Sequence, residues 1–263
     1  MHNISDKEWH FWKNNSYLVV KGLFKEEVPL MSEKVDELAK KDGNNHPWLC
    51  FHEMDRPEQL SRIEHFCPFI PELDNILRGE KILHIINRLM GEAGVLYKDR
   101  INFKYPEGGA HSAHQDGVAY ESSNQTYFDD STPPFISIFI SVDPANQENG
   151  CLELAPHWAL DNLSILPMEK PRADHPNFSK IADDIESSID WISIETEPGD
   201  VIFFTERIPH RSKPNQSQKS RRILYGVYNP MQLGDKRMKY FEEKKKNIND
   251  ARYMVGNPHA PVK

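Results

Sequence analysis

A run of short, alternating segments that starts near residue 97 limits the possible folds most strongly. Within residues 135–143, Ile136, Ile138, Ile140 and Val142 occupy every second position, which predicts a strand with two differently packed faces. Further strands, separated by turn residues, are expected over 151–155, 191–195, 201–205 and 223–228. Many short strands are typical of a β-sandwich or a jelly roll, and periodicity alone leaves both open.

The first 95 residues or so are mixed and helix-rich. Ser5 at the head of an acidic turn predicts a capped helix start, and residues 17–21 read as a short apolar strand. Apolar side chains at helical spacing predict helices over 26–41 and 81–90. Residues 43–75 resist regular structure, as does the polar stretch 156–190. Loops of that length act as lids or are merely solvated excursions, and both readings stay open.

No linker divides the chain, which predicts a single domain over residues 1–263. Its expected parts are a helix-rich region over about 1–95, a β core over about 97–230 and a C-terminal helix or tail over 231–263. The basic run Lys244–Lys246 follows two glutamates and is expected to be a solvated helix face. The sequence indicates no particular oligomeric state.

Composition excludes several partners. A formal charge of −8 argues against attraction to nucleic acid or to an anionic membrane. Three scattered cysteines without a CxxC pair suit a reducing compartment, and neither a secretory signal nor a membrane-spanning apolar run is visible. The protein is therefore expected to be cytoplasmic.

The most informative motif is a histidine and an aspartate two residues apart, His114 and Asp116. On an extended strand both side chains point to the same side. A third ligand must come from elsewhere, and His210, just past the expected strand 201–205, is the best candidate. Two imidazoles and one carboxylate leave three adjacent coordination positions, which suits Fe(II). The same donors can also hold zinc in a hydrolase, and an HxD triplet alone is weak.

The residues after His210 strengthen the iron reading. Ser212 follows two residues on, and Arg221 and Arg222 lead into the expected strand 223–228. Adjacent strand residues point to opposite faces, so at most one of the two arginines enters the barrel. There a guanidinium would pair with a carboxylate, and Ser212 could add a hydroxyl hydrogen bond.

In this combination the chain resembles the phytanoyl-CoA dioxygenase family. The resemblance spans nearly the whole chain in order, through residues 16–24, 114–116, 149–156, 197–204 and 210–221. It implies a double-stranded β-helix (jelly roll, cupin-like), a mainly β fold with flanking helices. It also implies Fe(II) at His114, Asp116 and His210, with 2-oxoglutarate as co-substrate bound by Arg221 and Ser212, and O2 as oxidant. Residues 100–104 are similar to a stretch in ectoine hydroxylases, where the asparagine contacts 2-oxoglutarate, so Asn102 is a further candidate, although a merely polar strand face is nearly as good a reading.

The implied reaction is hydroxylation of a C–H bond with release of succinate and carbon dioxide. Related halogenases replace the carboxylate ligand by a small residue, so Asp116 favours hydroxylation. After Pro156 the chain departs from the family pattern with His157, so the substrate cannot be carried across. His111 and His157 are expected to be structural or to support the ligands.

Bacterial relatives with similar residues around positions 104 and 114–120 hydroxylate small polar molecules, including aminoalkylphosphonates and ectoine. A small charged substrate is therefore expected, with Lys104, Tyr120 and Arg62 as candidate contacts, although Arg62 could equally be an internal ion-pair residue. Alternatives are an acyl-CoA or natural-product hydroxylase of the same family, a zinc hydrolase, and a barrel-shaped binding protein without activity.

Overall fold

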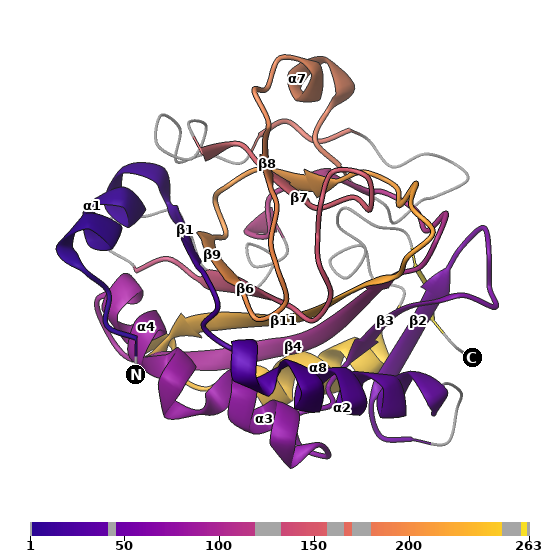
Figure 1. The fold of residues 1–263 in the computed structure, drawn as a ribbon, viewed down its shortest axis with the longest axis horizontal. Helices are drawn as coiled ribbons and strands as arrows, with labels where there is room; N and C mark the ends of the chain where they lie inside the picture. The colour runs from indigo at the N-terminus through magenta and orange to yellow at the C-terminus, as the bar shows by residue number, and fades with distance from the viewer. Residues whose placement is uncertain are drawn as a thin grey trace.

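The computed structural model describes residues 2–41, 46–118, 133–156, 166–169, 180–248 and 259–261. Its strands form two antiparallel sheets that face each other (Figure 1). The larger sheet has the order β1 (Tyr17–Val20), β9 (Val201–Thr205), β6 (Ile136–Ser141), β11 (Arg221–Pro230), β4 (Gly94–Lys104), β3 (Leu60–Glu64), β2 (Leu49–Glu53) and β12 (His259–Pro261). The smaller sheet has the order β5 (His111–His114), β10 (His210–Ser212), β7 (Leu152–Leu154) and β8 (Ile192–Ile194). This arrangement confirms the expected jelly roll.

The central strands of the large sheet are buried on both faces. Their outward side chains, such as Ile138 of β6 and Leu224 of β11, join one hydrophobic core with the helices. Their inward side chains, such as Phe204 of β9 and Tyr225 of β11, pack with Leu154 of the small sheet in a second core. Alternation therefore separates two apolar environments, which explains why both sides of these strands carry large side chains.

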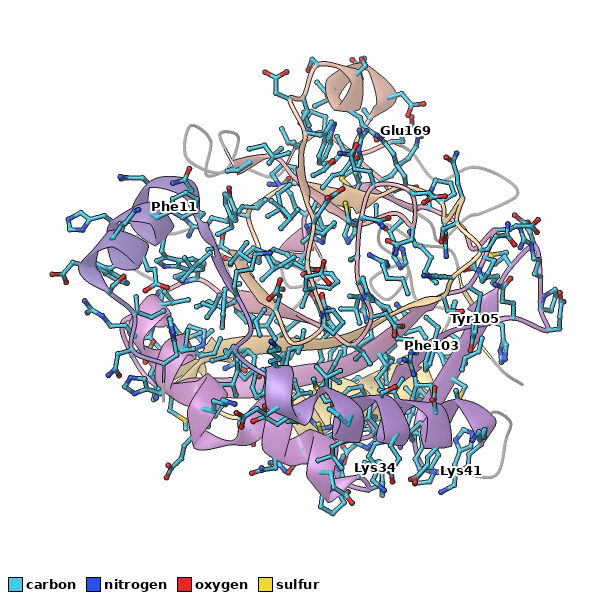
Figure 2. All side chains as sticks on the ribbon, viewed as in Figure 1. Phe11, Lys34, Lys41, Phe103, Tyr105 and Glu169 are labelled. Atoms are coloured by element: carbon cyan, nitrogen blue, oxygen red, sulfur yellow. The ribbon has the colours of Figure 1, made fainter. Side chains whose placement is uncertain are left out.

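The helices cover the outer face of the large sheet. They are α1 (Asp6–Asn15), α2 (Val28–Lys40), which follows the 3-10 turn η1 (Lys25–Glu27), α3 (Pro71–Arg78) and α4 (Glu80–Met90). In Figure 1, α2 and α3 lie below the sheet, and in Figure 2 the labelled Lys34 lies on that lower side. The helix start expected at Ser5 is capped, and Ser5 and Glu8 form a capping box at the start of α1. The predicted helices and strands of the first 95 residues are thus confirmed to within a few residues.

The expectation that residues 43–75 lack regular structure is wrong, because β2, β3 and the start of α3 lie in this stretch. The prolines mark the ends of these elements. Pro57 lies in the turn between β2 and β3, and Pro71 is the first residue of α3. All five residues of β3 are buried, so the strand shows no alternation from which a sequence pattern could predict it.

The second stretch expected to be irregular, 156–190, contains the short helix α7 (Asp183–Ser187) and a bridge between Met168 and Ile181. Much of it, including His157, lies outside the described residues, so the choice between a lid and a solvated loop stays open there. Within the described ranges, no helix is both long enough and apolar enough to cross a membrane.

The chain returns after β11 through the 3-10 turn η2 (Met231–Leu233) to the helix α8 (Arg237–Lys246). Phe241 is buried on this helix, and Arg237 forms an ion pair with Asp99 of β4. Lys244 is fully buried as well, so the expectation of a solvated lysine run is wrong at this position. A buried acid, described below, accounts for the difference.

Candidate active site

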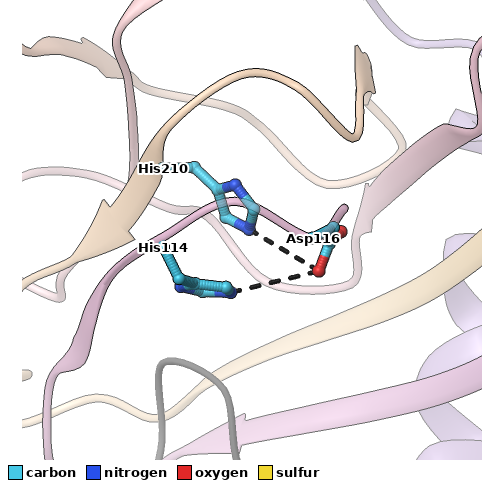
Figure 3. A group of neighbouring side chains, drawn as sticks. All are labelled: His114, Asp116 and His210. Atoms are coloured by element: carbon cyan, nitrogen blue, oxygen red, sulfur yellow. Dashed lines mark ion pairs between the residues drawn. The ribbon is translucent and has the colours of Figure 1, made fainter. Parts of the chain in front are cut away.

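Three buried side chains meet between the two sheets: His114, Asp116 and His210. His114 ends β5, His210 begins the neighbouring β10, and the two residues are partners in the register of these strands. Asp116 follows two residues after His114, and its Oδ1 lies 4.0 Å from the Nε2 atom of each histidine. Figure 3 shows all three side chains converging on one point. Strand pairing thus unites ligands that lie almost a hundred residues apart in sequence.

Backbone carbonyls fix the orientation of both imidazoles. The His114 Nδ1 lies 2.7 Å from the Ser112 carbonyl oxygen, and the His210 Nδ1 lies 3.0 Å from that of Ile208. Each Nδ1–H therefore donates outward, and each Nε2 lone pair faces the centre of the cluster. Burial lowers the pKa of His114 to about 3 and also lowers the pKa of His210. Both imidazoles are neutral at physiological pH, as metal ligands must be.

Two hydroxyl groups orient Asp116. Its Oδ2 accepts hydrogen bonds from Ser137 Oγ at 2.8 Å and from Tyr225 OH at 2.5 Å, so that Oδ1 faces the histidines. Burial opposes the carboxylate charge, but the nearby Lys98 ammonium and the two histidines keep the pKa of Asp116 well below its usual range. The donor set is therefore two neutral imidazoles and one ionised carboxylate, which fits Fe(II).

The sequence analysis did not single out Ser137 or Tyr225. A signal was present for Ser137, a polar residue inside the alternating strand 135–143, whose inward face carries it towards Asp116. Tyr225 gave no comparable signal, because a tyrosine on a buried strand is usually explained by packing alone.

We expect Tyr225→Phe to weaken metal binding by roughly 10- to 100-fold while the protein stays folded, because partners that orient a metal ligand contribute at that level. An iron titration followed by calorimetry measures the effect. Tyr228→Phe is the matched control, since the Tyr228 hydroxyl donates to the Leu77 carbonyl at 2.6 Å on the helix side of the same strand. Equal metal affinities in the two variants would contradict the role given to Tyr225.

The three side chains open into a cavity between the sheets, which Asn102, Ser212 and Arg221 line at one end. Arg221 is 3% exposed, and its Nε has no hydrogen-bond partner in the described part of the chain. The Asn102 Oδ1 also lacks one among the described residues. Burial lowers the pKa of Arg221 to about 10, so the guanidinium remains charged at neutral pH. A buried cation with an unsatisfied N–H fits an anionic ligand such as the far carboxylate of 2-oxoglutarate.

The neighbouring Arg222 points the other way. Its guanidinium forms ion pairs of 2.6 Å with Asp143 and with Asp36 of α2. Of the two arginines that the sequence left open, Arg221 faces the cavity and Arg222 holds a helix against the sheet.

The remaining candidates fall in different places. Lys104 lies at the Arg221 end of the cavity and donates to Ser212 Oγ at 2.7 Å, where His111 Nδ1 also lies 3.4 Å away. Arg62 does not line the cavity. It is buried on β3, with its Nε 3.0 Å from Glu64 Oε1, as the ion-pair alternative anticipated. Tyr120 lies outside the described residues.

A jelly roll with a His–Asp–His cluster facing a cavity that contains arginine defines a class, the mononuclear non-haem iron dioxygenases that use 2-oxoglutarate. The model of one family, phytanoyl-CoA dioxygenase (PhyH), matches residues 12–223, and the chain belongs to this family. The chain is accordingly an oxygenase, and the zinc hydrolase and the inactive binding protein lose their support.

Two curated relatives are similar over most of their length. A 2-aminoethylphosphonate dioxygenase from the uncultured bacterium HF130_AEPn_1 is 33% identical over 241 residues, which cover 90% of this chain and 86% of the relative. A methylphosphonate hydroxylase from Gimesia maris is 31% identical over 247 residues, which cover 93% and 88%. Among solved structures, EctD from S. alaskensis with 2-oxoglutarate and 5-hydroxyectoine has a TM-score of 0.70 at 16% identity and covers 87% of this chain and 77% of its own. The last likeness shows the fold alone.

Proposed function

We propose that this dioxygenase hydroxylates a C–H bond of a small organic phosphonate and converts 2-oxoglutarate and O2 to succinate and carbon dioxide. His114, Asp116 and His210 would hold Fe(II). The bound iron, with 2-oxoglutarate and O2, supplies the oxidising chemistry. The observation that carries the proposal is an excess of buried positive charge beside the metal cluster.

That charge lies on the inward face of β4. Lys98, Arg100, Asn102 and Lys104 share this face, because they pair in register with the inward residues of β11. Arg100 lines the cavity, and its guanidinium lies 5.1 Å from the centre of the Tyr225 ring. Lys98 is buried, and burial lowers its pKa to about 8 although Asp116 opposes the shift. Arg62 of β3 adds a further buried cation.

Two acids lie among these cations: Glu64 lies beside Arg62 and Arg100, and Asp116 interacts with Lys98. Burying a charge without a counter-ion costs several kcal/mol per ion. A bound anion would offset this cost, and more negative charge on the anion would offset more of it. A phosphonate carries up to two negative charges on a compact group and accepts hydrogen bonds from guanidinium forks. A neutral substrate would leave the positive charge of this group in excess of the two acids.

The two anionic ligands would then occupy different ends of the cavity. Arg221, Ser212 and Lys104 would hold the far carboxylate of 2-oxoglutarate, with Asn102 beside it, while Arg100 would hold the phosphonate. Lys104 is thereby assigned to the co-substrate, because its ammonium already contacts Ser212 and the Lys213 carbonyl. The two neutral imidazoles and single carboxylate would leave the iron centre with a net positive charge, which also attracts anions.

The relatives support the same substrate class, since both of those described above are named for phosphonates. A panel assay tests the proposal by measuring oxygen-dependent succinate release from 2-oxoglutarate. The panel contains methylphosphonate, 2-aminoethylphosphonate, its carboxylate analogue 3-aminopropionate, ectoine and an acyl-CoA. We expect stimulation by one or both phosphonates and little by 3-aminopropionate. Stimulation by the acyl-CoA alone, or by ectoine alone, would refute the phosphonate proposal and leave the oxygenase class intact.

We also propose that residues 1–263 act as one catalytic domain in the cytoplasm. Support for one domain comes from β1, β2 and β3, which belong to the same sheet as the strands after residue 94. Support for a reducing compartment comes from Cys50, Cys67 and Cys151, which are buried thiols that form no disulfide.

A further inference from the structure

Glu64 on β3 is fully buried and contacts three cationic side chains. Its Oε1 lies 3.0 Å from Arg62 Nε and 3.2 Å from Arg100 Nε. Its Oε2 lies 2.6 Å from the Nζ of Lys244, which comes from α8. Oε1 of Glu64 thus faces the two arginines of the sheet, and Oε2 faces the lysine of the helix.

This cluster adjoins the cavity through Arg100, which lines it. Glu64 and Arg100 are partners in the register of β3 and β4, so both side chains are on the inward face of the sheet. Arg100 alone of the four charged residues lines the cavity. Two neighbours bear on the direction of its guanidinium: the Glu64 carboxylate, at ion-pair distance without a hydrogen bond between Nε and Oε1, and the Tyr225 ring at 5.1 Å.

Lys244 reaches the cluster from outside the part of the chain that defines the family, since the family model ends at residue 223. Its side chain is 0% exposed and its ammonium lies 5.0 Å from the centre of the Phe51 ring. The helix is anchored at its other end, where Arg237 Nε donates to Asp99 Oδ1 at 3.1 Å. A fully buried lysine is costly, and packing alone would be served as well by leucine or methionine.

We propose that Lys244 is a positioning residue that keeps Arg100 available for the anionic group of the substrate. By occupying Oε2, Lys244 leaves Glu64 a single oxygen for the two arginines. Without Lys244, both carboxylate oxygens can turn to the arginines, pair with Arg100 through two hydrogen bonds and draw its guanidinium out of the cavity. This inference rests on the proposed phosphonate function and adds the helix α8 to the machinery of substrate binding.

The test compares Lys244→Met with Lys244→Arg, and Lys239→Met serves as the matched control because Lys239 is 78% exposed on the same helix. Calorimetry measures the affinity of methylphosphonate and of 2-aminoethylphosphonate for the anaerobic protein loaded with iron and 2-oxoglutarate. We expect Lys244→Met to weaken phosphonate binding about tenfold or more, a typical size for coupling between sites. Lys244→Arg should recover most of the affinity, and Lys239→Met should match the wild type.

Kinetics separate positioning from a general loosening of the fold. In Lys244→Met, KM for the phosphonate should rise while kcat at saturation and the 2-oxoglutarate requirement stay within about twofold, because Arg221 and the metal ligands are untouched. An unchanged phosphonate affinity, or an equal loss for phosphonate and 2-oxoglutarate, would overturn the inference. If Lys244→Met does not fold, Lys244→Gln, which keeps a hydrogen-bond donor without the charge, is judged by the same criteria.

The two proposals fail differently. If the wild-type protein binds neither phosphonate, the proposed function is wrong and the role of Lys244 falls with it. If the wild-type protein binds a phosphonate and Lys244→Met binds it equally well, only the positioning role is wrong.

Discussion

Asp116→Ala is expected to abolish turnover and to reduce iron binding below detection at ordinary iron concentrations. The variant keeps the two imidazoles but loses the single anionic ligand, and two neutral donors do not hold Fe(II) firmly. It also removes the acceptor that the buried hydroxyls of Ser137 and Tyr225 share, so that one of them can donate only to the other and the second loses its acceptor. A buried donor left unsatisfied costs about 1–3 kcal/mol. Metal analysis after dialysis and an assay of succinate release measure the two effects.

A neighbouring histidine provides the control for metal binding. His111 lines the same cavity but is not among the three converging ligands, so His111→Ala should retain its iron. Loss of iron from His111→Ala as complete as from Asp116→Ala, or full activity of Asp116→Ala, would overturn the ligand assignment. His114→Ala is expected to behave like Asp116→Ala.

Arg221→Ala should raise the 2-oxoglutarate requirement by about two orders of magnitude with little change in folding. A buried, charge-assisted contact of this kind contributes roughly 3 kcal/mol, and each 1.4 kcal/mol corresponds to about a factor of ten in affinity. The measurement is a kinetic titration with 2-oxoglutarate at saturating iron, together with anaerobic titration of the visible charge-transfer band that we expect from the iron complex.

Arg222→Ala is the matched control, because it removes the same side chain one residue away. Its guanidinium pairs with Asp143 and Asp36 on the outer face, so the variant should lower the unfolding temperature and leave the 2-oxoglutarate requirement unchanged. The assignment of the co-substrate site would be refuted if the 2-oxoglutarate requirement rose in Arg222→Ala and not in Arg221→Ala.

Sequence patterns predicted the strands whose two faces meet different surroundings, and they predicted the three residues that meet at the candidate metal centre. The motif at His114 and Asp116 could be read because the two residues are two positions apart in sequence, although Asp116 lies in the turn after β5 and not on the strand. His210 could be read because it follows the expected strand 201–205. Patterns failed where burial removes alternation, as in β3, all of whose residues are buried.

Patterns also failed where a charged residue is buried by a distant partner. Lys244 stands in a run that is typical of a solvated helix, and nothing local marks it as the partner of Glu64, 180 residues earlier in the chain. Such a pair becomes visible only when the packing of α8 against β3 and β4 is known. Buried ion pairs between residues far apart in the sequence are therefore the feature of this site that could not be predicted from one sequence.

The opposite orientation of Arg221 and Arg222 also bears on how β11 folds. A slip of one residue that moved Arg222 to the place of Arg221 in the pairing with β4 would turn the Arg222 guanidinium from the exterior to the interior. The interior would still receive a cation, but Asp143 and Asp36 would lose theirs. The two acids on the outer surface thus make the misaligned pairing less stable than the correct one. Contacts on the outer face of the sheet therefore help to set the strand register that places Arg221 in the cavity.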